Sequence, residues 1–151
     1  MATSRANDIA DALVHALKVI AHNQDPGEWL TSPKKVARGL VVGDLMALER
    51  PRIAVQVLSW RSTPTGPQTH DCTMRLGVHV IVDGDERAEV NLNNCVRDIL
   101  KAVVADETLE NHVTDIQPVE YVPQAEVMER TGLGIATVVF DAIFVWEHAA
   151  P

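Results

Sequence analysis

The chain has 151 residues, of which 46% are hydrophobic and 23% are charged. One domain of this size buries roughly 68–70% of its unfolded surface, so it needs no metal or disulfide to fold, and the composition excludes a disordered or collagen-like chain. The net charge of −8 argues against non-specific binding to nucleic acid.

No apolar run reaches the roughly 18–20 residues that span a bilayer, so we expect no membrane association. Asp8 and Asp11 interrupt the first apolar stretch, which excludes a secretory signal. The two cysteines, Cys72 and Cys95, form neither a disulfide framework nor a four-ligand zinc site. We therefore expect an intracellular product with reduced thiols.

Charge is unevenly distributed along the chain. Residues 34–52 hold five basic and two acidic side chains, a balance of +3, whereas residues 83–129 hold twelve acidic and three basic ones, a balance of −9. One interpretation is that both segments form ordinary solvated faces. The other is that a basic face of one subunit meets an acidic face of the next.

The N-terminal third predicts a helix, a loop and an ambiguous segment. Residues 4–21 carry apolar side chains at three- and four-residue spacing, which predicts a helix that Thr3 or Ser4 can cap. Residues 22–35 are rich in turn-forming residues and should form a loop that Trp29 and Leu30 pin to the body. Residues 36–48 fit one strand, two short strands, or a short helix after Gly43.

Residues 52–60 and 72–82 alternate between apolar and polar and predict two strands. In the second strand, the apolar residues share one face; they are Met74, Leu76, Val78, Val80 and Val82. The segment between the strands, residues 61–69, contains two prolines, a glycine and no apolar side chain for a core. It predicts a mobile loop or the tip of a long hairpin.

The C-terminal half predicts a helix followed by two strands. A helix over about residues 86–105 should bury its apolar stripe and be capped by Asp83 or Asp85; the stripe comprises Leu92, Val96, Ile99 and Val103. Residues 113–122 indicate a strand broken by Pro118, with Val113, Ile116, Val119 and Val122 as its apolar positions. Residues 126–134 are polar and end in a turn, and residues 135–146 predict a strand that is central or long and is bulged at Asp141.

Helices and strands in this order predict an α+β fold within a single domain, residues 1–151. Its sheet should be mostly antiparallel, with two main helices packed on one face and a long hairpin loop.

Three patterns resemble chemical sites but do not meet the geometry that those sites need. Adjacent residues of a strand point to opposite faces, so His70, Asp71 and Cys72 cannot form a triad by themselves. The acids at residues 83–89 lack the spacing of a calcium loop, and the glycines at 132 and 134 precede a strand, not a phosphate-binding helix. The histidines are scattered. We predict no catalytic, cofactor or metal residues, and no enzymatic role.

The layout of residues 5–147 resembles the tail terminator (tail completion) proteins of long-tailed bacteriophages. The resemblance runs through IADALVHALK, RPRIAVQVLSW, MRLGVHVIVDG, AEVNLNNCVRDILKAVVAD and GIATVVFDAIFVWE. Its most family-like part is the pattern D-x-T-L-x-x-x-V-x-D-I at positions 106–116. Many members carry a glycine near positions 110–111, where this chain has Glu110 and Asn111.

This resemblance implies a structural virion protein without a cofactor. Such proteins form a ring, usually hexameric, that caps the finished tail tube, stops its polymerisation and offers a surface to the head-side connector. The expected partners are therefore further copies of the chain, the tail tube protein and the connector protein. The expected location is the head-proximal end of the virion tail, after assembly in the host cytoplasm. DNA passes through the lumen without specific binding, which an acidic lumen would favour because like charges repel.

A ring needs a heterologous interface, in which one face of a subunit binds a different face of the next. The candidate interface residues belong to the polar hairpin segment, the second polar segment and the basic segment: Arg61, Ser62, Thr63, Pro64, Thr65, Gln68, Glu126, Glu129, Arg130, Lys34, Lys35 and Arg38.

Two alternatives remain open from the sequence. A head–tail connector (neck) or tail tube subunit would use the same kind of contacts at another place in the virion. A small intracellular enzyme or ligand-binding domain would need a pocket with convergent polar groups, for example a cleft that brings His70, Cys72 and an acid together.

Overall fold

The computed structural model describes residues 4–21, 28–39 and 49–147. Its elements are α1 (Arg5–Ala21), β1 (Lys35–Arg38), β2 (Arg52–Gly66), β3 (Thr69–Val82), α2 (Ala88–Ala105), β4 (Asp115–Pro123), α3 (Ala125–Thr131) and β5 (Gly134–Glu147). The α+β class is confirmed, as are the two main helices and the strands near their predicted positions. Of the ambiguous segment 36–48, residues 36–38 belong to β1, and residues 40–48 lie outside the described residues.

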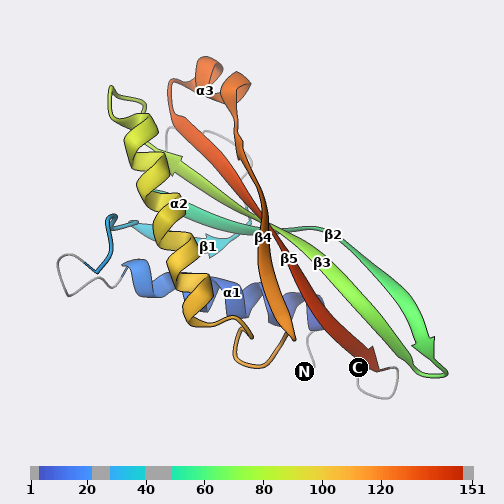
Figure 1. The fold of residues 1–151 in the computed structure, drawn as a ribbon. Coiled ribbons are helices and arrows are strands. Elements are labelled where there is room, and N and C mark those ends of the chain that lie inside the picture. The colour runs from blue at the N-terminus through green and yellow to red at the C-terminus, as the bar shows by residue number, and fades with distance from the viewer. Residues whose placement is uncertain (1–3, 22–27, 40–48, 148–151) are drawn as a thin grey trace.

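The sheet has five strands in the order β1-β2-β3-β5-β4 (Figure 1). The short β1 pairs with β2 in parallel, and the other three pairs are antiparallel. The last strand, β5, lies between β3 and β4, so its predicted central position is confirmed. The predicted bulge at Asp141 is wrong, because β5 pairs with β3 without a break through Arg75 and Asp141. The irregularity lies instead in β4, between Pro118 and Glu120.

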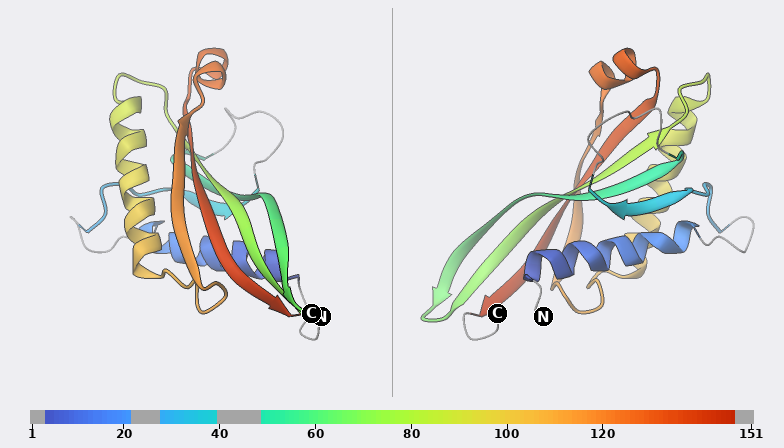
Figure 2. Two further views of the ribbon diagram at one scale, coloured as in Figure 1. Left: turned by 45° about the vertical axis from the view of Figure 1, so that its right-hand side comes forward. Right: turned by 180° about the vertical axis from the view of Figure 1, so that it is seen from behind.

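Helices α1 and α2 pack on the same face of the sheet (Figure 2). The predicted alternation of β3 is confirmed, since Met74, Leu76, Val78, Val80 and Val82 are all buried against this helical layer. Phe140 of β5 is fully buried at the centre of the core. The opposite face of the sheet, which α1 and α2 leave uncovered, is called the open face below.

Of the two alternatives for residues 61–69, the tip of a long hairpin is confirmed and the mobile loop is wrong, because the strands continue to Gly66 and Thr69. Strands β2 and β3 pair through Pro64 and His70, and only Pro67 and Gln68 form the turn. The end of β5 follows β3 outward, so a three-stranded arm projects beyond the helices (Figure 1). We call residues 59–75 of the hairpin, together with residues 141–147 of β5, the arm.

The polar segment after β4 contains a helix that the sequence pattern did not predict. Helix α3 ends at Gly132, whose φ of +72° is readily adopted only by glycine. A Cβ on Gly84 would lie 1.4 Å from the Gly132 carbonyl oxygen, so the turn before α2 packs directly on the end of α3. Leu133, Ile135 and Ile81 form a small second apolar cluster there.

One predicted apolar contact is wrong. Trp29 packs against the core as predicted, but Leu30 beside it is 52% exposed. The apolar Val119 of β4 is also exposed, at the irregularity that follows Pro118.

Candidate assembly surfaces

The arm carries six of the predicted interface residues. Every residue from Arg61 to Gln68 is exposed, so this part of the hairpin makes no contribution to the core of its own chain. The strand ladder nevertheless holds it in one extended conformation. A long, ordered projection of this kind has its side chains available for a neighbouring molecule.

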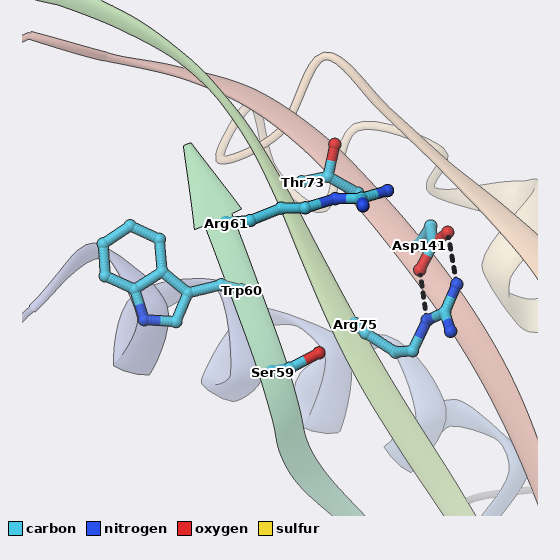
Figure 3. Close-up of a pocket in the computed structure, with 6 residues that line it drawn as sticks. All are labelled: Ser59, Trp60, Arg61, Thr73, Arg75 and Asp141. Carbon is cyan, nitrogen blue, oxygen red and sulfur yellow. Dashed lines mark hydrogen bonds and ion pairs between the residues drawn. The ribbon is translucent and has the colours of Figure 1, made fainter. Parts of the chain in front are cut away.

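On the open face, the root of the arm has a polar pocket of about 260 Å³ (Figure 3). Arg75 of β3 donates two hydrogen bonds to Asp141 of β5, at 3.0 and 3.2 Å, and the carboxylate raises the pKa of the Arg75 guanidinium. The side chain of Arg61 extends from β2 over β3 toward Thr73, as Figure 3 shows. Arg61 makes no ion pair within the described residues, so its guanidinium is free to bind a carboxylate of another chain.

On the helical face, the root of the arm has an apolar pocket of about 250 Å³. Trp60 of β2, Phe144 and Trp146 of β5, and residues 4–6 at the start of α1 line it. Trp60 is 54% exposed. The adjacent Arg61 points to the other face of β2 (Figure 3). The guanidinium of Arg5 lies 5.8 Å from the centre of the Phe144 ring and adds a positive charge at the pocket rim.

The second predicted set, Glu126, Glu129 and Arg130, lies on α3. All three are exposed and make no ion pair with any described residue. Helix α3 stands at the end of the sheet opposite the arm (Figure 1). The structure therefore does not bring these residues together with the arm of the same chain.

The basic segment is only partly available. Arg38 donates hydrogen bonds to Asn7 and Asp11 of α1, at 3.1 and 3.3 Å, and Arg50 pairs with Asp83 at 2.7 Å. Arg52 is buried. Lys34 and Lys35 are exposed and form no ion pair with the described residues. Two of the five basic side chains of this segment, Arg38 and Arg50, thus pair with acids of their own chain.

Sequence reasoning predicted that Trp29 pins the loop at residues 28–32 to the body, but it missed the carboxylate that holds this loop. The fully buried carboxylate of Asp98 on α2 accepts hydrogen bonds from the Leu30 and Thr31 backbone N–H groups, at 3.1 and 2.8 Å, and from the Thr31 hydroxyl at 2.6 Å. Arg97 donates a fourth bond at 2.9 Å. The ammonium of Lys101 lies 4.6 Å from the Trp29 ring centre and donates to the Glu28 carbonyl. The only sequence signal was an acid, Asp98, on the apolar side of a helix.

The open face also carries a hydrogen-bonded row around His79. Gln56 Oε1 accepts from His79 Nε2 at 2.8 Å, which leaves Nδ1 to accept from the Thr137 hydroxyl at 2.8 Å. The Gln124 amide donates to the same Thr137 oxygen at 3.4 Å. Burial lowers the pKa of His79, so the neutral imidazole that this row accommodates is also the favoured form.

His70, Asp71 and Cys72 do not converge. The His70 ring lies 5.4 Å from the Trp146 ring, Asp71 is exposed, and Cys72 is buried on the helical face. Burial and the Asp71 charge raise the pKa of the Cys72 thiol, and burial raises that of Cys95 to about 11. Both thiols are therefore poor nucleophiles. Within the described ranges, no group of His, Cys, Asp and Glu side chains has the arrangement of a metal site.

Among residues 4–21, 28–39 and 49–147, no helix is long and apolar enough to cross a membrane. Comparison with protein-family models and with curated proteins finds no match for this chain.

Proposed function

We propose that the chain is a structural subunit that assembles head to tail into a ring, and that this ring is the terminator of a long phage tail. In this role it caps the tail tube, stops further polymerisation and presents a surface to the head-side connector. Its work then consists of contacts with copies of itself and with those two partners, at the head-proximal end of the tail.

The observation that carries the proposal is the arm. Residues 61–68 are fully outside the chain's own core, yet they are held in a strand ladder and flanked at their root by two pockets. Tryptophan and arginine are the side chains that most often dominate binding energy at interfaces. Trp60 and Arg61 occupy adjacent positions here and face opposite sides of β2 (Figure 3).

The placement of the candidate residues also favours a ring. The arm and α3 lie at opposite ends of the molecule (Figures 1 and 2), so a row of copies in which the arm of one meets α3 of the next would use both surfaces. A head-to-tail contact joins unlike surfaces, and it closes into a ring when the rotation per subunit divides a full turn. The net charge of −8 suits a lumen through which DNA passes without binding.

A trimmed arm tests this proposal. Replacing residues 63–71 with Asn-Gly connects the paired residues Ser62 and Cys72 by a two-residue hairpin turn. The removed residues contribute no apolar side chain to the core, so the variant should retain the circular dichroism spectrum and cooperative unfolding of the wild type. Light scattering on a sizing column should find rings for the wild type and monomers for the variant.

Retention of rings by the folded, trimmed protein would contradict the role of the arm. Rings that form normally but do not arrest growth of phage tail tubes in a polymerisation assay would instead place the subunit at a connector or within the tube. Arg87, which is exposed at the start of α2, offers a surface control. Arg87→Glu should have the same native mass in light scattering as the wild-type ring.

A further inference from the structure

The apolar pocket at the arm root is open on the surface of its own chain. Its walls are aromatic side chains from two strands, Trp60, Phe144 and Trp146, and its floor is the first turn of α1. Its volume of about 250 Å³ has room for a branched aliphatic side chain. Pockets of this type, central, aromatic and rimmed by charge, are where hot-spot side chains of a partner insert.

At the other end of α1, the chain presents such a side chain. Leu30 is half-exposed, although its loop is held by three hydrogen bonds to a fully buried carboxylate. Burying a charge is costly unless it is fully hydrogen-bonded, so the buried Asp98 carboxylate keeps the loop N–H groups in place. The loop conformation that these bonds fix leaves the Leu30 side chain in solvent. A preorganised apolar side chain loses little entropy when it binds.

The two features face in opposite directions. Residues 28–34 lie at the far side of the molecule from the arm and from the start of α1 (Figures 1 and 2). Leu30 therefore cannot fill the pocket of its own chain, but it can fill the pocket of the next copy in a head-to-tail row. The neighbouring charges are complementary, since exposed Glu28 accompanies Leu30 and exposed Arg5 stands at the pocket rim.

We propose that Leu30 of one subunit inserts into the pocket formed by Trp60, Phe144 and Trp146 of the next, with Glu28 facing Arg5. The occupant of the pocket is thus a second copy of this chain. This contact rests on the ring proposed above and assigns one of its interfaces. Asp98 acts as a positioning residue, because it holds the loop and touches the neighbour only through it.

Cross-linking of two single-cysteine variants tests the contact directly. Leu30→Cys and Ala6→Cys place thiols on the loop and in the pocket wall, and one of the two proteins carries a mass tag. The native thiols are buried, and the raised pKa values of Cys72 and Cys95 keep them unreactive. Oxidation of the equimolar mixture with copper phenanthroline should give mainly the mixed, tagged–untagged disulfide.

The control replaces Ala6→Cys with Lys18→Cys, an exposed position near the other end of α1. It should reduce the yield of mixed disulfide at least tenfold. Equal yields with both partners would overturn the contact, and so would a predominant dimer of Leu30→Cys with itself, which indicates a symmetric pairing.

A second measurement compares two aliphatic truncations. Leu30→Ser should weaken self-association at least tenfold in light scattering, whereas Val104→Ser, at an even more exposed valine of α2, should leave it unchanged. If rings persist with Leu30→Ser and the Leu30→Cys and Ala6→Cys pair gives no mixed disulfide, this contact is overturned and the ring itself remains. If the wild type does not assemble and the cysteine pair gives no mixed disulfide, both proposals are overturned.

Discussion

The Asp98 clamp gives a stability prediction that follows directly from geometry. Oδ1 accepts from Leu30 N and from Arg97, and Oδ2 accepts from Thr31 N and from the Thr31 hydroxyl. In Asp98→Asn, one of the two oxygens becomes an NH₂ group that donates. With NH₂ in place of Oδ1, Leu30 N–H and Arg97 lose their acceptor; with NH₂ in place of Oδ2, only Thr31 N–H does, because the Thr31 hydroxyl can turn and accept from the amide.

A hydrogen bond to a charged group contributes roughly 1.5–3 kcal/mol. One or two lost contacts at the lower figure destabilise the fold by about 1.5–3 kcal/mol, because the loop can open and let water reach its N–H groups. For a chain of this length, 1 kcal/mol corresponds to roughly 2–4 °C, so the melting temperature should fall by about 3–12 °C.

Urea and thermal unfolding, followed by circular dichroism, measure this loss. The matched control is Asp11→Asn, which removes the same charge from an exposed pair with Arg38 at 3.3 Å. Exposed pairs of this kind contribute about 0–1 kcal/mol. If Asp98→Asn destabilised the protein no more than Asp11→Asn does, the buried clamp would have no energetic importance.

Two further predictions concern backbone strain and pH. Residues 109–111 have positive φ angles of 46°, 58° and 68° without a glycine among them, so Glu110→Gly should stabilise the fold by about 1 kcal/mol in urea unfolding. Glu107→Gly, in the same turn but without a positive φ, should be neutral or destabilising, and equal effects of the two would contradict the strain argument. Burial lowers the pKa of His79 in the folded state, whereas its pKa in the unfolded chain is near 6.5. As the pH falls below about 6.5, the unfolded chain therefore binds a proton on this side chain before the folded chain does. The unfolding free energy should therefore fall as the pH drops from about 7 to about 5, and His79 can contribute at most about 1.4 kcal/mol per pH unit to this fall. His79→Gln should make the fall less steep. If the pH dependence of the variant equals that of the wild type, groups other than His79 cause it.

The fold class was predictable because the strongest patterns were long. The apolar stripe of α1 extends over several helical turns, and the alternation of apolar and polar residues in β3 extends over several residue pairs. Both patterns match the side chains that are buried in the structure. Helix α3 was not predictable in the same way, since its seven residues include none that is fully buried. Its place is set by Gly132 and by contact with the turn at Gly84.

The candidate surfaces were predictable only as segments. The absence of apolar residues at 61–68 correctly indicated that this region lies outside the core, but the ladder that extends it as an arm depends on pairing with β3 and β5. Both pockets combine residues that are distant in sequence. The exposure of Leu30 depends on Asp98, 68 positions away, and no local pattern in the sequence contains that information.

Native mass spectrometry of the wild-type protein over a range of concentrations tests ring formation most directly. Head-to-tail closure predicts a single dominant oligomer, with monomer at low concentration and no population of larger species beyond the closed ring. A monomer at every concentration, or an unlimited ladder of oligomers, would contradict it.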